Sequence, residues 1–195
     1  MPKLRQTPSQ TVGPYFAYGL APEQYGYQRS LTSIAGSQMA EGDIEGERIR
    51  VEGIVFDGTG APISDALIEV WQADSQGRYA HPADPRGSNS TFKGFGRCGT
   101  GTDAQSRFWF DTIRPGRVAA DQAPHLNVIV SMRGMLPHAF TRIYFPDEVA
   151  NATDTVLNSV PRERRSTLIA IHRGGNVYRF DIHMQGDNET VFFDV

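Results

Sequence analysis

The stretch of sequence that decides the fold is Val51–Tyr79, VEGIVFDGTGAPISDALIEVWQADSQGRY. Its first part alternates apolar and polar side chains with a period of two, which is typical of a half-buried strand. Residues 66–73 alternate in the same way after the Gly/Pro-rich loop 57–62. The simplest interpretation is two antiparallel strands joined by that loop. A second turn then places Tyr79 at the rim of the sheet, where side chains face loops rather than the core.

The rest of the chain repeats this pattern of short alternating segments. Single strands are predicted at residues 95–100, 107–113, 125–132, 141–145 and 190–195. A hairpin is predicted from 167–172 and 177–183, because the Arg-Gly-Gly-Asn segment 173–176 is a strong turn signal. Residues 147–160 form either a short helix or a loop, and Pro161 suits the first position of a helical turn. Short strands, Gly/Pro turns and almost no helix indicate an all-β antiparallel sandwich.

Length and composition fit one domain over residues 1–195. The chain is 39% hydrophobic and carries a net charge of −3, and single β-sandwiches of this size are ordinary. Scattered basic residues exclude a nucleic-acid surface, which would be clustered and strongly basic. No segment approaches the roughly 18 apolar residues of a membrane span. One cysteine, Cys98, and a polar start without the apolar run of a secretion signal lead us to expect a cytoplasmic protein.

The first 46 residues lack a regular pattern. Residues 7–15, TPSQTVGPY, are rich in turn formers, and Pro8 and Pro14 fix the backbone. This segment is either an ordinary N-terminal arm or a preshaped loop that lines a pocket. Residues 16–46 carry aromatics and glycines with no period of 2 or 3.6. So long an irregular stretch is uncommon in an isolated domain, and it predicts an arm, about residues 1–46, that packs on a partner chain.

Local motifs for metal or nucleophile chemistry are absent from the sequence: there is no paired Cys motif, HExxH, GxSxG or phosphate loop. His125 and Asn127 lie two apart on a predicted strand, so both could reach one ion. An amide oxygen is a poor substitute for imidazole, which leaves half a metal site. The alternative is that both side chains hydrogen-bond to loop backbone. His81 and Asp84 lack an evident third ligand, and Cys98 is most simply a small buried residue.

Seven segments distributed over nearly the whole chain carry a family resemblance: TPSQTVGPY, EVWQADSQGRY, FGRCGT, FWFDTIRPG, APHLNVIVSMRG, TRIYF and TVFFDV. Together and in this order they resemble the intradiol ring-cleaving dioxygenases. The resemblance implies the β-sandwich of that family and its mononuclear non-haem Fe(III), bound by two tyrosines and two histidines. The first tyrosine comes from a G-x-Y turn, the second from P-G-x-Y and the histidines from H-x-H.

This sequence keeps only part of that ligand pattern. Tyr79 matches the first tyrosine and His125 matches the first histidine, but Val118 stands in place of the second tyrosine and Asn127 in place of the second histidine. An iron ion bound here would lose half of its protein ligands, including an anionic one that favours Fe(III) over Fe(II). We therefore expect no iron and no catalytic residue in this chain.

The resemblance also implies what such a chain does. The family includes enzymes built from two related chains, and this chain is similar to the one without iron. Its expected partner is a homologous beta chain that holds the Fe(III), in a hetero-oligomer of alpha/beta pairs. The implied substrates are O2 and protocatechuate, a catechol with a carboxylate, cleaved to 3-carboxy-cis,cis-muconate. The implied substrate-binding residues of this chain are Thr11, Gly13, Pro14, Tyr15 and Arg133.

Physical chemistry agrees with a role for Arg133, because a buried carboxylate requires a partner such as a guanidinium. Without the resemblance, the sequence favours an exposed charge at a strand end. Two other functions remain open. One is a non-catalytic β-sandwich scaffold or binding module that diverged from the dioxygenase fold. The other is a self-sufficient dioxygenase with unusual ligands, which predicts a purple-red tyrosinate–iron colour and ring cleavage by this polypeptide alone.

Overall fold

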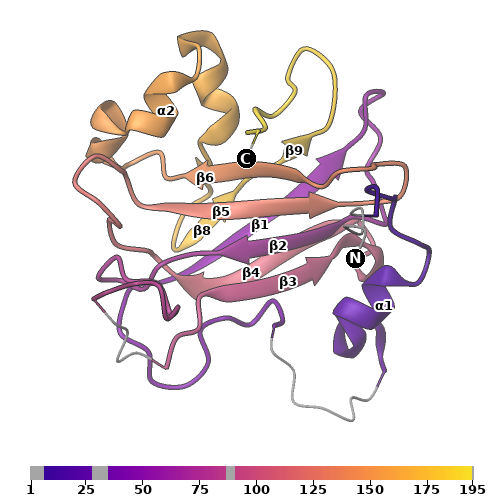
Figure 1. Cartoon of the computed structure of the whole chain (residues 1–195), viewed down its shortest axis with the longest axis horizontal. Helices are drawn as coiled ribbons and strands as arrows, with labels where there is room; N and C mark the ends of the chain where they lie inside the picture. The colour runs from indigo at the N-terminus through magenta and orange to yellow at the C-terminus, as the bar shows by residue number, and fades with distance from the viewer. Residues whose placement is uncertain (1–6, 28–34, 87–90, 195) are drawn as a thin grey trace, which may run out of the picture.

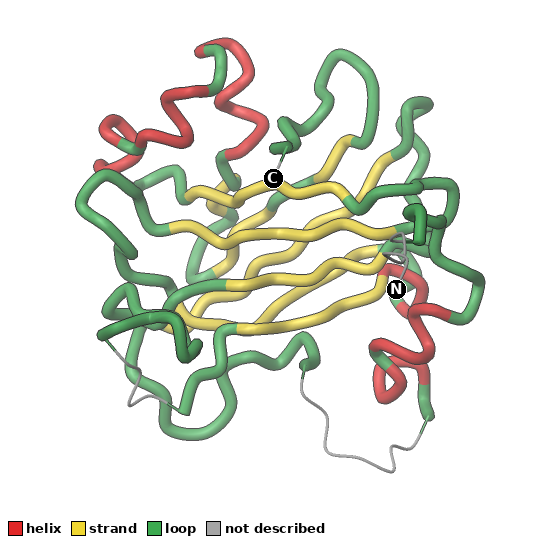
Figure 2. Tube along the Cα trace, in the orientation of Figure 1, coloured by secondary structure: helices red, strands yellow, loops and turns green. Residues whose placement is uncertain are grey.

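The computed structural model describes residues 7–27, 35–86 and 91–194. Residues 1–6 and 28–34 of the predicted arm, and the last residue of the predicted C-terminal strand, lie outside the described residues. Within the described ranges the strands form two sheets, and the helices are short and confined to the margins (Figure 1, Figure 2). The prediction of an all-β sandwich is confirmed.

Each sheet is organised around one central strand. In the first sheet β1 (Arg48–Phe56) lies between β4 (Arg107–Ile113) and β8 (Val177–Arg179), with β7 (Ile171–His172) beyond β8 and β9 (Ile182–His183) also pairing β1. The second sheet has the order β3 (Phe95–Gly99), β2 (Leu67–Trp71), β5 (His125–Ser131), β6 (Ala139–Tyr144). The second sheet is antiparallel throughout, whereas β8 and β9 run parallel to β1. The expected antiparallel pairing therefore holds for most strand pairs.

The predicted hairpin between β1 and β2 is wrong, because the two strands belong to different sheets. β1 pairs with β4, and β2 pairs with β3 and β5. Fully buried side chains of both strands, Val51 and Val55 from β1 and Ile68 and Val70 from β2, pack into one core cluster. Two strands that each cover the other sheet's apolar face bury both faces at once. Residues 57–62 reverse the chain locally, with an isolated antiparallel bridge between Phe56 and Pro62, and the chain crosses to the other sheet only after that turn.

The predicted strands at 95–100, 107–113, 125–132 and 141–145 are confirmed within two residues as β3, β4, β5 and β6. The hairpin around residues 173–176 is also confirmed, as β7 and β8, but both strands are shorter than predicted, since the predicted strand 177–183 is divided into β8 and β9. Thr167 belongs instead to the 3₁₀ helix η4 (Arg162–Leu168), and Pro161 caps that helix rather than opening it.

The predicted strand at 190–195 is wrong, since the described part of it forms only an isolated bridge between Phe193 and Phe140. Side chains replace the ladder here. The Val191 N–H donates to the Thr167 hydroxyl over 3.2 Å, and the Val191 carbonyl accepts from the Thr141 hydroxyl over 2.8 Å. Backbone groups satisfied by side chains are not free to pair with a strand.

Short helices lie at two margins of the sandwich. α1 (Phe16–Leu20) and η1 (Pro22–Tyr25) lie beside the end of β3, and α2 (Thr155–Ser159) lies on the opposite side (Figure 1). The remaining 3₁₀ helices are η2 (Thr100–Thr102) and η3 (Val149–Thr153). The Gln24 amide fastens η1 to the edge of β3, accepting from the Gly99 N–H over 2.8 Å and donating to its carbonyl over 2.7 Å. No helix in the described ranges has the length and apolar character needed to cross a membrane.

Candidate functional site

The positions that the resemblance assigns to iron ligands gather at the start of β5. We call Tyr79, Val118, His125 and Asn127 the substituted site. His125 and Asn127 alternate with core residues, so both face away from the core. The Asn127 amide donates to the Tyr79 hydroxyl over 3.1 Å and to the Trp71 carbonyl over 3.3 Å. The Tyr79 ring stacks on Trp71, with centroids 5.6 Å apart and planes 7° from parallel.

A tight turn positions Tyr79. The buried Asp74 carboxylate accepts from the Gln76 and Arg78 N–H groups, each over 2.9 Å. Gly77 occupies the left-handed region at φ +78°, and a Cβ there would lie 1.9 Å from the Arg117 carbonyl oxygen. Only glycine fits such a position without moving the backbone. The turn therefore fixes the direction in which Tyr79 leaves the sheet.

The loop after Tyr79 is held by an ion pair and by hydrogen bonds. Asp84 accepts from the Tyr79 N–H over 2.9 Å and pairs with Arg86 over 2.7 Å, and Arg86 holds the pKa of this carboxyl well below its usual range. Arg86 also donates to the Val118 carbonyl over 3.1 Å. His81 Nδ1 accepts from the Ala83 N–H over 3.1 Å. His81 and Asp84 thus shape this loop by hydrogen bonding.

His125 is 3% exposed, and its ring is oriented by one hydrogen bond. Nδ1 lies 2.7 Å from the Ala123 carbonyl oxygen, and because a carbonyl only accepts, Nδ1 carries the proton. Nε2 is buried and has no hydrogen-bond partner among the described residues. Burial, and after it the positive charge of Arg142, lowers the pKa of His125 to about 4. The imidazole is therefore neutral at pH 7.

The donor chemistry of the substituted site does not fit Fe(III). A ferric ion is stabilised by anionic ligands, and Tyr79, whose phenol pKa is raised by burial, is the one residue of the four that could supply an anionic side chain. Val118 has no ligating atom, and Asn127 offers only a neutral amide oxygen in place of an imidazole. His125 Nε2 is a ligand-type atom that is buried and has no hydrogen-bond partner among the described residues. The alternative reading of His125 and Asn127, in which both bond to backbone carbonyls, matches the geometry.

Sequence reasoning missed a polar cluster beside the substituted site. Arg142, directly opposite Asn127 in the β5–β6 register, donates to the Gln122 amide oxygen over 3.3 Å and to the Tyr144 hydroxyl over 3.4 Å. Tyr144 in turn donates to buried Asp154 over 3.1 Å. The alternation of TRIYF places Arg142 and Tyr144 on one face, but nothing in the sequence connects them with Gln122 or Asp154.

An apolar cavity of about 820 Å³ adjoins the substituted site on the outer face of the second sheet. Its walls are largely aromatic and aliphatic, and Tyr79 and Asn127 contribute its polar atoms together with the loop that carries Asp84; the apolar lining includes Trp71, Phe95, Ile129 and Phe140. Aromatic walls with a few polar groups are typical of small-molecule sites. Two of the four iron-ligand positions, Tyr79 and Asn127, thus border this cavity.

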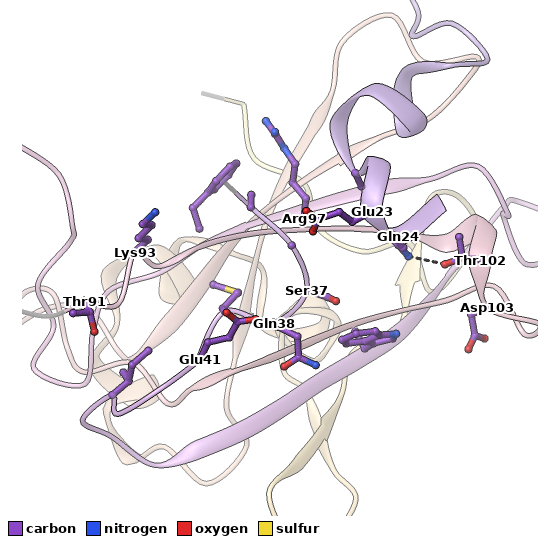
Figure 3. A pocket seen from close by; sticks show the side chains of 17 residues that line it. Glu23, Gln24, Ser37, Gln38, Glu41, Thr91, Lys93, Arg97, Thr102 and Asp103 are labelled. Carbon is purple, nitrogen blue, oxygen red and sulfur yellow. Dashed lines mark hydrogen bonds between the residues drawn. The ribbon is translucent and has the colours of Figure 1, made fainter. Parts of the chain in front are cut away.

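A second cavity, of about 760 Å³, lies between residues 35–44 and the strands β3 and β4 (Figure 3). Side chains of both charges surround it, among them Glu41, Lys93, Arg97 and Asp103, and the Gln24 amide donates to the Thr102 hydroxyl at its margin over 2.8 Å. None of the candidate residues from the sequence lines this cavity.

The five residues that the resemblance assigns to substrate binding lie at the other end of β5. We call Thr11, Gly13, Pro14, Tyr15 and Arg133 the arm patch. All five are exposed. The Thr11 hydroxyl accepts from the N–H of Gly134 over 2.8 Å, which fastens the arm beside Arg133. The structure therefore places Thr11 of the arm next to the strand end that carries Arg133.

Two further residues belong to this region, and no sequence signal identified them. Asp65 forms an ion pair with Arg133 Nε, and the Arg133 side chain remains 59% exposed. Tyr18 of α1 lies with its ring centroid 6.0 Å from that of Tyr15. Tyr15 is itself 76% exposed. The arm patch thus combines a charged group held by a carboxylate with uncovered aromatic surface.

Comparison with known proteins identifies the family. The family model described as "Dioxygenase" matches residues 13–186. The chain is 56% identical to the protocatechuate 3,4-dioxygenase alpha chain of Burkholderia cepacia over all of both chains, and 34% identical to the beta chain of the same enzyme, covering 80% of this chain and 72% of that one.

A solved structure agrees in fold. The dioxygenase domain of a Streptomyces dioxygenase–carbohydrate-binding fusion matches 92% of this chain and 97% of its own, with a TM-score of 0.60 and 25% identity. Members of this family generally use non-haem Fe(III). The residues of the substituted site do not match the ligand set that the family uses for this ion. On the evidence of its sequence, its two-sheet fold and these relatives, the chain belongs to the intradiol dioxygenase family.

Proposed function

We propose that this chain is the alpha subunit of a protocatechuate 3,4-dioxygenase. In this role it completes the substrate pocket of a homologous beta chain, which holds the Fe(III). The assembled enzyme cleaves protocatechuate between its two hydroxylated carbons, inserts both atoms of O2 and forms 3-carboxy-cis,cis-muconate. The observation that carries the proposal is the substituted site, whose donors do not fit Fe(III) in a chain that otherwise belongs to an iron-dependent family.

The arm patch supports the second half of the proposal. Its residues are exposed but held in place by the contact between Thr11 and Gly134. Exposed aromatic surface that is fixed in position is typical of surface that another protein covers. We propose that the single domain 1–195 uses its N-terminal arm, about residues 1–46, to pack on the beta chain. In that arrangement the arm patch forms one wall of the partner's pocket.

Within that wall, Arg133 is assigned to the substrate carboxylate. Its ion pair with Asp65 uses Nε, and a guanidinium carries five N–H donors, so donors remain for a second carboxylate. Asp65 then orients the guanidinium. Gly13 and Pro14 present backbone with little bulk, and a Cβ at Gly13 would meet nothing within 4 Å. These residues act by positioning the ring and by excluding water from it.

A cytoplasmic location is part of the proposal. It is supported by the cysteine content, because the one cysteine of the sequence, Cys98, is buried and unpaired. Burial raises the pKa of its thiol to about 11, so it is an unreactive core residue.

The test is expression of the full chain alone, of the iron-bearing beta chain alone, and of both together. Iron content and ring cleavage are measured on each purified preparation. We expect a colourless, inactive product from this chain alone, and a co-purifying complex that cleaves protocatechuate faster than the beta chain alone. A purple-red, active preparation of this chain alone would contradict the proposal. Failure to co-purify, with no gain in activity, would favour the non-catalytic scaffold instead.

A further inference from the structure

Arg142 is the cation nearest in register to the substituted site. It faces Asn127 across the β5–β6 pair, and side chains directly opposite in an antiparallel pair lie on one face with Cβ atoms about 5 Å apart. Asn127 stands where the family has its second histidine, and its amide bonds to Tyr79. Arg142 therefore lies directly opposite the ligand position Asn127, which is itself hydrogen-bonded to the ligand position Tyr79.

The charge of Arg142 is fixed there by neutral partners. Among the described residues no carboxylate forms an ion pair with it. Instead it donates to the Gln122 amide oxygen and the Tyr144 hydroxyl, and the Tyr144 hydroxyl donates to the buried Asp154 carboxylate. A half-buried guanidinium balanced only through an intervening hydroxyl leaves a local positive field. The charge of Arg142 acts on two of the ligand positions: it adds to the burial that lowers the pKa of His125, and it opposes the burial that raises the pKa of Tyr79.

We propose that Arg142 excludes iron from this chain independently of the two missing ligands. The guanidinium belongs to the residue directly opposite Asn127 and puts a positive charge beside the substituted site, and like charges repel strongly in a partly buried site. Restoring a phenol at Val118 and an imidazole at Asn127 would then supply four ligand-type side chains without supplying a site. Three positions of this chain, Val118, Asn127 and Arg142, then keep iron out of it, rather than the first two alone.

The experiment compares iron binding in full-length variants assembled with the beta chain. The background is the double variant V118Y/N127H, which restores both ligand types. To it is added either R142Q, which removes the charge and keeps hydrogen-bonding groups, or R142K, which keeps the charge. The distant variant R179Q, which removes a positive charge on the other sheet, is the control. The readouts are iron bound beyond the wild-type assembly and the new tyrosinate-to-iron absorption.

We expect the double variant, R142K and R179Q to bind no additional iron. The R142Q triple variant should gain about 10- to 100-fold in iron affinity, the range by which groups just outside a metal's ligands alter binding. Equal iron in the double variant and the R142Q triple variant would overturn the inference. So would equal iron in R142Q and R142K, or a folded R142Q triple variant that gains none.

A smaller perturbation protects the test against misfolding. N127H alone and N127H/R142Q are titrated with Zn²⁺, which binds imidazole readily, and tighter binding is expected only in the second. The inference rests on the proposed function, and the outcomes separate the two. Iron in the wild-type chain expressed alone would defeat the proposed function, whereas iron in V118Y/N127H equal to that in the R142Q triple variant would defeat only the role of Arg142.

Discussion

The two ends of β5 differ in how their polar groups are satisfied. At its start, Asn127 bonds to Tyr79 and to backbone, and His125 is 3% exposed. At its end, roughly 20 Å along the strand, Tyr15 and Arg133 are largely exposed. At the start of β5 the Asn127 amide donates to groups of its own chain, whereas at the end of β5 the side chains of Tyr15 and Arg133 are open to solvent. A region that has lost a ligand needs internal partners, whereas a region that serves a partner chain must keep its groups available.

This contrast separates stability from function within one strand. A polar group buried without a partner costs free energy, so the hydrogen bonds of Asn127 and of His125 Nδ1 stabilise the start of β5, where His125 Nε2 has no partner among the described residues. The arm patch pays no such cost while it is exposed, and it can therefore keep charged and aromatic groups for recognition. Substitutions near His125 should consequently alter unfolding, and substitutions near Arg133 should alter catalysis by the assembled enzyme.

The largest effect is expected for Asp154→Ala. Its buried carboxylate caps α2 through the Leu157 N–H over 2.7 Å, and it also accepts from the Ala123 N–H over 2.6 Å and from the Tyr144 hydroxyl. Loss of the helix cap, together with the two donors left without an acceptor, the Ala123 N–H and the Tyr144 hydroxyl, should lower the free energy of unfolding by about 3–5 kcal/mol. Chemical denaturation measures this. The exposed Asp121→Ala should change it by less than about 0.5 kcal/mol, and equal losses would contradict an internally bonded end.

The next effect is the pH dependence conferred by His125. Its pKa is about 4 in the folded chain against 6.5 for the free side chain, so the unfolded chain binds the proton more readily. Stability is complete above about pH 6.5 and falls as pH decreases toward 4. At about 1.4 kcal/mol per pH unit, the loss approaches 3 kcal/mol.

The measurement is the unfolding free energy of the wild type and of His125→Asn between pH 7 and pH 4. The asparagine amide can still donate to the Ala123 carbonyl, but it does not titrate. The difference between the two proteins should therefore change across this window. Parallel curves would show that His125 is not held neutral by its surroundings.

At the opposite end of β5, Arg133→Ala should leave the thermal unfolding temperature unchanged and raise KM of the assembled enzyme for protocatechuate. Losing a charge-assisted hydrogen bond to the substrate carboxylate corresponds to roughly a 10-fold increase. Catechol, which has no carboxylate, should be affected much less. Steady-state kinetics with both substrates provide the comparison, and Arg173→Ala in the exposed β7–β8 turn is the control. Equal increases for both substrates would refute carboxylate recognition.

The sequence was informative wherever one element determines the outcome. Alternation along 125–131 placed His125 and Asn127 outward, and the Arg-Gly-Gly-Asn turn located a hairpin. Alternation failed for the pairing of β1, because it tells which face is buried but not which strand is the neighbour. The same limit applies to the segment after Thr190, whose backbone groups are taken by the distant Thr141 and Thr167 hydroxyls.

The site divides along the same line. Tyr79, His125 and the arm patch were identified from segments that resemble the family, each readable within a few residues. Alternation along TRIYF places Arg142 on the correct face. It gives Arg142 no role, because the partners Gln122 and Tyr144 become neighbours only when the loop before β5 meets β6. Interactions that link separate segments require the fold before they can be recognised.

The smallest effect is expected for Tyr79→Phe. The substitution removes the hydroxyl that accepts from Asn127 and keeps the ring that stacks on Trp71. The unfolding free energy should fall by about 0.5–1.5 kcal/mol, the usual contribution of one hydrogen bond. Iron content and turnover of the assembled enzyme should not change, because the phenol of this chain is bonded internally. Denaturation and metal analysis of the same preparations measure both quantities.

The matched control is Tyr27→Phe, because Tyr27 is 57% exposed and loss of its hydroxyl should affect neither quantity. The pair of variants asks whether the start of β5 is structural only. If Tyr79→Phe lowers bound iron while Tyr27→Phe does not, the hydroxyl of Tyr79 reaches a metal in the assembled enzyme. Both ends of β5 would then serve catalysis, because a Tyr79 phenol that binds a metal is not merely a hydrogen-bonding partner of Asn127.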